Sequence, residues 1–519
     1  MQQDRVHTAE RADFFGLRGL RLKIAMVVLT VLPSFLLFGY NNGSMGPITN
    51  LESFAKQFPR IDVVTTKGEE KSYNALILGI VVACYNLGCI SGALSTIAYG
   101  NVFGRLRSIG IGLVLSLIGL AVETSSYSLG QLIVGRLLVG GSIGILSASI
   151  PVWQTECATT KHRGAFVIME GIFISAGITF PNWISFGTFP ALHGSTQWRV
   201  TMVLPAVLAI CALPFLFWMP ESPRWLMLKG RVNDARNVIA AIMDKPQDHE
   251  NVSAEVAHIQ SQLELTTGNV KSFFTRRPER PLHRALIAFA AQSMTQWNGC
   301  SAMISYTGIV FADLGFEGTQ GHLLGAGFTT TFTVAAILPL FLVDRVGRRK
   351  LFLVAAFGVC VSMAVLAGTA GRSEYAPVAL TFMFLYAVSY AIGFLGLPFL
   401  YASEIAPIRL RVPISAISVT GQWLGQFVVG QITPPGLTNL GSRYWIIWAV
   451  FNASFIPIIY FFFPETNGRS LEDIDELFES SGTLNVVSNA RKWNSSWQAE
   501  DVQSANQHKG SSMTEIEEA

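Results

Sequence analysis

Long apolar runs alternate with short polar turns along most of the chain. A run of about 18–25 apolar residues is long enough to cross the roughly 30 Å hydrocarbon core of a bilayer as one helix. The pattern therefore predicts an all-α membrane protein with twelve transmembrane helices. The runs lie at about 24–46, 75–98, 108–126, 128–152, 165–188, 199–219, 285–307, 321–343, 350–371, 376–402, 412–433 and 443–463.

The composition supports this interpretation. Of 519 residues, 50% are hydrophobic and only 14% are charged, whereas soluble domains carry about 25% charged residues. The net charge of +3 gives no sign of a nucleic-acid partner, and the basic residues lie in turns where they are expected to face acidic lipid headgroups. The six cysteines fall in or beside apolar runs without metal-ligand spacing, so we expect neither a metal site nor disulfides.

The turns between the runs carry an uneven distribution of charge. At 338–350 an apolar run ends at Asp344, and the cations Arg345, Arg348, Arg349 and Lys350 follow. Ionised groups are costly in lipid, so this segment must be a turn at a membrane face. The short turns after even-numbered runs carry ten cations and those after odd-numbered runs carry three. The even turns are therefore expected in the cytosol, together with both termini, most simply at the plasma membrane.

Three features of these turns occur twice, in the same order. Their offsets are 243, 248 and 244 residues. An internal duplication of this kind is typical of membrane transporters built from two halves. The paired features are Asn101, Gly104 and Arg105 with Asp344, Gly347 and Arg348; Glu156 and Arg163 with Glu404 and Arg411; and PESPR at 220–224 with PETNGR at 464–469.

The duplication and the runs divide the chain into five segments. We expect a cytoplasmic tail at 1–23, a six-helix half at 24–219, a cytoplasmic linker at 220–284, a second six-helix half at 285–463, and a partly disordered cytoplasmic tail at 464–519. Apolar residues at helical spacing predict amphipathic helices in the linker and in the second tail. The cytoplasmic segments contain no phosphate-binding glycine loop of the P-loop type, so no nucleotide or other cofactor is expected.

Paired charges at the even turns predict a gate. Ion pairs between helix ends would hold the cytoplasmic side shut while the site opens outward, and would break when it opens inward. Topology alone asks for cations at this face, but not for a carboxylate seven residues before an arginine in both halves. The expected gate residues are Arg105, Glu156, Arg163, Asp344, Arg348, Arg349, Glu404 and Arg411.

These motifs resemble the sugar porter family of the major facilitator superfamily. That family has D-x-x-G-R-R after its second and eighth spans, E-x6-R after the fourth and tenth, and P-E-S-P-R and P-E-T-x-G-R after the sixth and twelfth. The resemblance runs from about residue 30 to 479, and 153–156, 169–171 and 432–436 look most like the fungal branch of hexose, disaccharide and polyol transporters. It implies a secondary transporter, not an enzyme, that rocks two halves around a central site for a small polyhydroxylated substrate.

The resemblance also implies a set of substrate-binding residues. The family's seventh span reads Q-Q-x-x-G-x-N, of which only Gln296 is unchanged here, while Phe399 stands at the tryptophan position of span ten. Amides and hydroxyls would bind the hydroxyl groups of a sugar or polyol, and aromatic rings would cover its apolar faces. The expected residues are Asn41, Thr295, Gln296, Ser301, Tyr306, Phe399, Gln422, Trp423 and Gln426.

Charged residues within the spans are functional candidates. Arg136 in span four resembles the family arginine near the sugar and the proton. Glu170 in span five is expected to be protonated, paired with Arg136, or facing water, and Glu123 is expected to reach the membrane interface. Asn41 stands where proton-coupled members have Asp, and it cannot titrate. A facilitator is therefore predicted, with proton symport through Glu170 as the alternative.

Other functions stay open beside these. The departures at Thr295, Ser301 and Phe399 also suit a transporter of the same fold for a non-sugar, secondary metabolite. A sensor that does not transport would be expected to have a longer tail than the 50 residues after Arg469. A membrane enzyme would need a paired acid and base or metal ligands at a membrane face, and the sequence shows neither. We expect the protein to act as a monomer.

Overall fold

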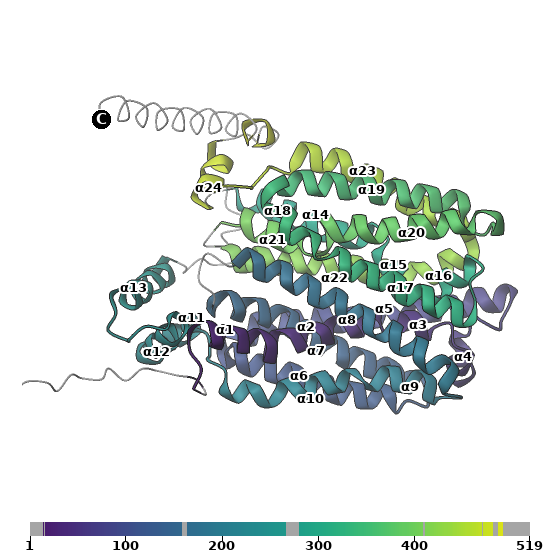
Figure 1. Cartoon of the computed structure of the whole chain (residues 1–519), viewed down its shortest axis with the longest axis horizontal. Coiled ribbons are helices and arrows are strands. Elements are labelled where there is room, and N and C mark those ends of the chain that lie inside the picture. The colour runs from purple at the N-terminus through teal and green to yellow at the C-terminus, as the bar shows by residue number, and fades with distance from the viewer. Residues whose placement is uncertain are drawn as a thin grey trace, which may run out of the picture.

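The computed structural model describes residues 14, 16–157, 163–265, 280–407, 410–469, 471–480 and 486–490. Within these residues every extended element of regular structure is a helix, and the long helices run side by side along one axis (Figure 1). The expected disorder of the second tail concerns mainly 481–485 and 491–519, which lie outside the described residues.

The first half begins with a broken span and continues through five further spans. Its helices are α1 (Gly19–Met26), α2 (Leu32–Gly43) and α3 (Met45–Ile48), then α5 (Gly68–Phe103), α6 (Arg105–Thr124), α7 (Leu129–Cys157), α8 (Arg163–Ala191), and α9 (Thr196–Val203) with α10 (Pro205–Phe215).

The second half repeats this order with more breaks. Its helices are α14 (Pro281–Trp297), α15 (Cys300–Ser305) and α16 (Thr307–Asp313), then α17 (Gly318–Ala335) with α18 (Leu338–Val346), α19 (Arg348–Thr369), α20 (Ala376–Tyr390) with α21 (Leu397–Ile405), α22 (Arg411–Leu440) and α23 (Tyr444–Phe462).

By length and composition, eight of the described helical stretches qualify as membrane spans, or nine if the bent pair α17–α18 counts as one. One of these stretches, Pro413–Phe462, holds two successive helices, α22 and α23. The long α8 and the broken α14–α16 complete twelve, which confirms the predicted fold class. Several helices extend past the predicted runs. For example, α5 covers 68–103 rather than 75–98, because its polar ends continue beyond the hydrocarbon.

The two halves lie side by side (Figure 1). At their junction α5 packs along α22 and α8 packs along α17. Side chains also bond across it: Ser72 Oγ donates to Asn439 Oδ1 (2.9 Å), and Trp183 Nε1 donates to Thr330 Oγ1 (2.9 Å). Between these contacts, the interior between the halves is lined by residues of α2, α8, α14, α15, α17, α20, the α20–α21 break, α21 and α22.

Short helices gather at one end of the bundle, which is named here the charged end because it carries the turns at 104 and 347. They are α11 (Pro223–Leu228), α12 (Val232–Met243), α13 (Glu250–Leu265) and α24 (Leu471–Ser480) (Figure 1). The predicted amphipathic helices therefore form. On α12 the apolar side chains Ala235, Val238, Ile239 and Ile242 are buried, and α12 packs against α1.

Arg284, at the start of α14, holds α24 to the bundle. Its side chain is fully buried, pairs with Asp475 of α24, and lies 4.4 Å from the centre of the Phe478 ring. Its Nη1 atom also donates to the carbonyl of Ile405 (3.4 Å). One buried guanidinium thus connects α14, α21 and α24. In the first half, Arg18 Nε lies 3.5 Å from Asp244 Oδ1 at the end of α12, an analogous but more exposed pair.

Candidate functional site

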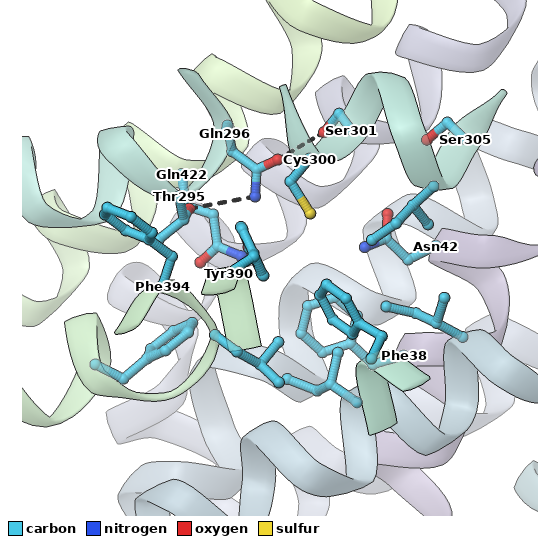
Figure 2. Close-up of a pocket in the computed structure, with 16 residues that line it drawn as sticks. Phe38, Asn42, Thr295, Gln296, Cys300, Ser301, Ser305, Tyr390, Phe394 and Gln422 are labelled. Atoms are coloured by element: carbon cyan, nitrogen blue, oxygen red, sulfur yellow. Dashed lines mark hydrogen bonds between the residues drawn. The ribbon is translucent and has the colours of Figure 1, made fainter. Parts of the chain in front are cut away.

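A cavity lies between the halves near the middle of the bundle, and both polar and apolar side chains line it (Figure 2). Its polar side chains come mostly from the second half, and no charged side chain of the described residues lines it. The lining residues are Phe38, Asn42, Ile174, Ile178, Thr295, Gln296, Cys300, Ser301, Ile304, Ser305, Phe332, Tyr390, Phe394, Leu395, Phe399 and Gln422.

A break in the seventh span places the polar residues. The helix α14 ends at Trp297, and Gly299 adopts φ +92°, a conformation that suits glycine. The side chain of Asn298 stabilises the break, because its Oδ1 accepts from the backbone N–H of Cys300 (2.9 Å). Residues before and after the break, Gln296 and Ser301, therefore face the same cavity.

A second break places the aromatic lining. After α20 the chain forms a π-helical turn at Ala391–Leu395, and α21 restarts after Gly396 with Pro398 near its first turn. Proline supplies no N–H and disfavours a helical conformation in the residue before it, which explains why the helix is interrupted there. The break presents Phe394, Leu395 and Phe399 to the cavity.

The cavity amides differ in how far they are already bonded. Ser301 Oγ donates to Gln296 Oε1 (2.6 Å), and Gln296 Nε2 donates to Thr295 Oγ1 (3.3 Å). These three form one chain of hydrogen bonds along the break, shown by dashed lines in Figure 2. Gln422 lies beside Thr295 in the same view, is half-buried and also lines the cavity.

Four residues predicted for the site lie outside the cavity lining. Asn41 Nδ2 donates to Leu37 O of its own helix (2.8 Å), and the next residue, Asn42, lines the cavity instead. Tyr306 is fully buried and donates to Gly430 O (2.6 Å). Trp423 lies behind the lining, 5.4 Å from the Phe38 ring. Gln426 also lies behind it and donates through Nε2 to Asn42 Oδ1.

The partner of Arg136 is Glu123, which corrects the expectation that Glu123 reaches the membrane interface. Both are deeply buried, 4% and 3% exposed, with Arg136 Nη1 lying 3.3 Å from Glu123 Oε1. Arg136 also donates to the carbonyls of Val81 (3.1 Å) and Val82 (3.4 Å). A buried arginine needs a counter-charge and acceptors for its remaining N–H groups, and α6 and α5 supply them.

Glu170 has no ion-pair partner among the described residues. It is 6% exposed, and its Oε1 atom is buried without a hydrogen-bond partner there. On α8 it lies one turn before Ile174 and two turns before Ile178, which both line the cavity, so it continues the same helix face towards the charged end. The next residue, Gly171, lies against Gly396 of the second half, at the α20–α21 break.

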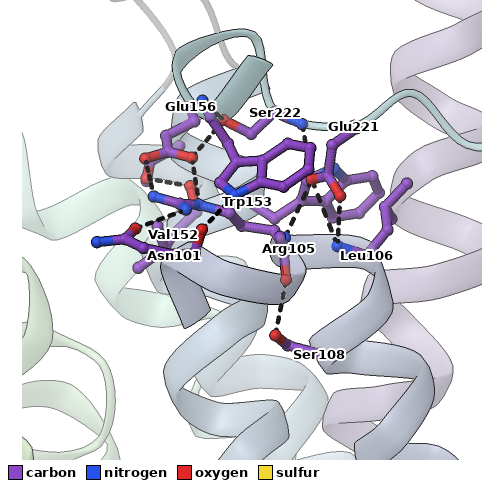
Figure 3. A network of polar contacts seen from close by, with 12 residues as sticks. Asn101, Arg105, Leu106, Ser108, Val152, Trp153, Glu156, Glu221 and Ser222 are labelled. Atoms are coloured by element: carbon purple, nitrogen blue, oxygen red, sulfur yellow. Dashed lines mark hydrogen bonds and ion pairs between the residues drawn. The ribbon is translucent and has the colours of Figure 1, made fainter. Parts of the chain in front are cut away.

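At the charged end of the first half, Arg105 joins three elements (Figure 3). Its Nε and Nη2 atoms donate to the two oxygens of Glu156 (2.9 and 3.0 Å), and Ser222 Oγ donates to the same carboxylate. Trp153 Nε1 donates to Pro220 O (2.9 Å). The turn after the second span, the end of the fourth span and the segment after the sixth are thus bonded together.

Glu221 closes this network by capping a helix. Its carboxylate accepts from the backbone N–H groups of Arg105 (3.1 Å) and Leu106 (3.2 Å), the first residues of α6. A carboxylate at a helix N-terminus satisfies free N–H groups and opposes the helix dipole. Burial raises the pKa of Glu221, and the bonds from Ser222, Leu106 and Arg105 act in the opposite direction.

The second half repeats the network with related residues. Arg348 Nη2 lies 2.8 Å from Glu404 Oε1, Thr466 Oγ1 donates to Glu404 (2.6 Å), and Tyr401 OH donates to Pro464 O (2.9 Å). Glu465 accepts from the backbone N–H of Arg348 (2.8 Å) at the start of α19. The equivalence of Glu221 and Glu465 was visible in the repeated P-E motif, although sequence analysis did not include these carboxylates in the gate.

The remaining predicted gate residues divide into three groups. Asp344 pairs with Arg348 (3.0 Å), although its own side chain is 79% exposed. Arg349 donates to Tyr460 O and lies 5.0 Å from the centre of the Tyr460 ring, so it contacts α23. The side chains of Arg163 and Arg411 lie outside the described part of the chain. The ion pairs of Arg105 and Arg348 join helices within one half.

Two six-helix halves that enclose a central, uncharged, polar cavity define a membrane transporter of the major facilitator fold. Residues 26–478 match the family described as Sugar (and other) transporter, and the chain belongs to this family. It is therefore an integral, multi-pass membrane transporter, and its relatives are transporters, not enzymes.

Individual relatives agree with the family. The chain is 33% identical over 478 residues to the sugar transporter STL1 of Saccharomyces cerevisiae, covering 90% of this chain and 83% of that one. It is 33% identical over 495 residues to the MFS-type transporter oryC of Aspergillus oryzae, covering 93% and 90%. The xylose transporter XylE from E. coli, in a partially occluded inward-open conformation, has a TM-score of 0.73 at 22% identity over 86% of this chain and 99% of its own, and shows the fold.

Proposed function

We propose that the protein carries a sugar or polyol across the membrane by alternating access. The observation that carries this proposal is the cavity lining, which combines amides and hydroxyls with aromatic rings and, among the described residues, carries no charge. A neutral polyhydroxylated molecule needs this combination, since each buried hydroxyl must be hydrogen-bonded and its apolar faces pack on rings. Relatives named as sugar and glucose transporters support the same substrate class.

Within the cavity, Gln296, Thr295, Ser301 and Gln422 are the proposed partners of substrate hydroxyls. Phe399, with Phe394 and Phe38, supplies the apolar walls. Trp423, Gln426, Tyr306 and Asn41 are proposed to act from behind this lining, by positioning helices around the cavity. For Tyr306 the bond to Gly430 O, between the seventh and eleventh spans, supports a positioning role.

The charged networks are proposed to keep each half rigid at its gate end. Because Arg105 and Arg348 bond helices within a half, they make the three helix ends of that half move together. Rocking then opens and closes the interface between the halves, and the networks themselves need not break. This refines the expectation of ion pairs that open in each cycle.

The charged end is proposed to face the cytosol, with both termini inside, in a plasma-membrane monomer surrounded by lipid. The cation count of the turns supports this orientation. The proposed division is into halves at 24–219 and 285–463, a cytoplasmic linker at 220–284, and cytoplasmic tails at 1–23 and 464–519. A glycosylation acceptor fused after Ala519 should remain unmodified, whereas one inserted near Lys67 should be modified. The reverse pattern contradicts the orientation.

Uptake of radiolabelled hexoses, pentoses and polyols into cells lacking their own transporters tests the substrate class. Saturable uptake of at least one of them is expected, and is competed by the unlabelled compound. A chain that is present at the membrane but transports none of them favours the alternative of a non-sugar metabolite.

We further propose facilitated diffusion as the mode of transport, with proton symport as the second candidate. Asn41 cannot titrate, and Arg136 already has Glu123 as its counter-charge. The buried, unbonded Oε1 of Glu170 favours the second candidate, because intramembrane carboxylates often relay protons. Under facilitation, uptake levels off at equal concentrations and ignores a protonophore. Accumulation that collapses with a protonophore, and that Glu170→Gln abolishes while exchange persists, establishes symport through Glu170.

A further inference from the structure

Two side-chain contacts join α2 of the first half to α22 of the second half beside the cavity. Gln426 Nε2 donates to Asn42 Oδ1. One turn away, the rings of Phe38 and Trp423 lie 5.4 Å apart. Phe38 and Asn42 also line the cavity, so the contact between α2 and α22 shares these two residues with the cavity.

Asn42 is the one polar side chain that the described part of the first half contributes to the cavity lining, beside Phe38, Ile174 and Ile178. It is half-buried, and Figure 2 shows its amide facing the side of the cavity that carries Cys300 and Gln296. A substrate bonded to the second half can therefore make a directed bond to the first half through Asn42.

The partner of Asn42 is incompletely bonded. Gln426 is 3% exposed, and its Oε1 atom has no hydrogen-bond partner among the described residues. A buried amide oxygen without a donor is unfavourable. A donor brought in by a ligand next to Asn42 would relieve it.

We infer that Asn42 is the substrate contact of the first half, and that a substrate hydroxyl replaces the hydrogen bond between Asn42 and Gln426. The inference rests on the proposed function and deepens it. A hydroxyl is both a donor and an acceptor, so one substrate hydroxyl accepts from Gln426 Nε2 and donates to Asn42 Oδ1, and a neighbouring hydroxyl donates to the free Oε1 of Gln426. In the empty carrier the two halves are then hydrogen-bonded to each other directly. In the loaded carrier they are hydrogen-bonded through the substrate.

Cys300 lines the same cavity and reports its opening without knowledge of the substrate. In a chain whose other five cysteines are replaced by Ala, the rate of alkylation of Cys300 by N-ethylmaleimide measures access to the cavity. Asn42→Leu and Gln426→Met keep side-chain size but remove the bond. Each should raise the rate in the absence of substrate by about twofold to tenfold, the range expected for one hydrogen bond.

Gln431→Met is the matched control. Gln431 lies on the same helix and donates across the halves to Leu76 O (3.4 Å), away from the cavity and in an exposed position. Its replacement should change the rate less than twofold. The double variant Asn42→Leu with Gln426→Met should react no faster than the quicker single variant, since both remove one bond. Unchanged alkylation rates in both single variants would contradict the proposal that the hydrogen bond between Asn42 and Gln426 holds the halves together.

Substrate protection tests the contact separately. D-glucose, D-xylose and D-sorbitol are each titrated against alkylation. For any compound that protects the parent chain, Asn42→Leu should raise the protecting concentration about tenfold or more, and Gln431→Met should not. Asn42→Thr, which keeps a hydroxyl, should restore part of the protection and serves if the Leu variant fails to fold. Equal protection in parent and Asn42→Leu overturns the contact. Absence of protection in the parent counts against the proposed function. The alkylation rates measured without substrate still test whether the hydrogen bond between Asn42 and Gln426 holds the halves together.

Discussion

The two halves are closely alike at the charged end and different at the cavity. At the charged end, arginine, glutamate, hydroxyl and capping carboxylate recur as Arg105, Glu156, Ser222 and Glu221 and as Arg348, Glu404, Thr466 and Glu465. At the cavity, the second half supplies nearly all polar groups, whereas the first supplies Phe38, two isoleucines and Asn42. Under the proposed alternating access both halves move as rigid bodies, which accounts for the shared network. The proposed site needs polar contacts to the substrate only once, and the second half supplies most of them.

The largest expected effect comes from removing the arginine of either network. Arg348→Ala should destabilise the protein by about 3 kcal/mol and Arg105→Ala by about 2 kcal/mol, because each leaves a partly buried glutamate without its counter-charge. The second half should lose more, since Arg348 also bonds Asp344 and Asn467. Thermal unfolding in detergent, with uptake measured alongside, checks the order. Arg345→Ala, an exposed cation of the same turn, is the control. A larger loss for Arg105→Ala would contradict the comparison.

The turn glycines should behave alike in the two halves. Gly104 and Gly347 have φ +91° and +94°, and an added Cβ would lie 2.7 Å from Glu221 Oε2 and 2.6 Å from Glu465 Oε2. Alanine is strained in this conformation and would displace the capping carboxylate. Each substitution should therefore cost about 2 kcal/mol in the same unfolding assay. Gly110→Ala, where the added Cβ meets only Leu216 at 3.6 Å, should be nearly neutral.

Substitutions in the cavity should have different effects on uptake in the two halves. Gln296→Ala removes an amide from the polar side and should raise the KM for uptake about tenfold, the effect of losing roughly one to two hydroxyl contacts. Ile178→Val trims the apolar wall contributed by the first half and should change the KM less than about threefold. Concentration-dependent uptake of a transported sugar measures both. If Ile178→Val proved the more damaging, recognition would not be concentrated in the second half.

The smallest expected effect concerns one of the differences between the two networks. Arg105 bonds the amide of Asn101 (3.1 Å), where Arg348 has the carboxylate of Asp344. Asn101→Asp should stabilise the first half by about 0.5 kcal/mol, a typical value for an exposed i, i+4 pair, and the gain should fade at high salt. Asp344→Asn should produce a loss of similar size. A gain that salt does not reduce would point to a cause other than charge.

Sequence was sufficient for the fold because hydropathy sets helix length and the duplication sets the order of the halves. It also identified Thr295, Gln296, Ser301, Phe399 and Gln422, since motif positions in the seventh, tenth and eleventh spans correspond to cavity positions. It predicted Asn41, whereas the neighbouring Asn42 is the residue that lines the cavity, because one residue turns a side chain about 100° around a helix. Periodicity alone does not specify that rotation.

Pairs between helices were harder to predict than single positions. Glu123 and Arg136 are thirteen residues apart on two helices joined by a short turn, and only the packing of α6 on α7 brings them together. Hydropathy treats Glu123 as the polar end of a span, which is why the membrane interface was expected. The capping carboxylates Glu221 and Glu465 were signalled by duplication, but their acceptor role depends on backbone N–H groups that no side-chain pattern records.

The anchor at Arg284 has a practical consequence for anyone who shortens or labels the chain. A protein cut after Arg469 would lose α24, and with it the carboxylate of Asp475 that neutralises a fully buried guanidinium. The exposed cation would then sit beside Ile405, one residue from Glu404 of the second network. Purification handles and fluorescent reporters are best attached beyond Ala490. If a shortened form is poorly produced, the loss of Asp475 as the counter-ion of Arg284 explains it, and no lost targeting signal need be assumed.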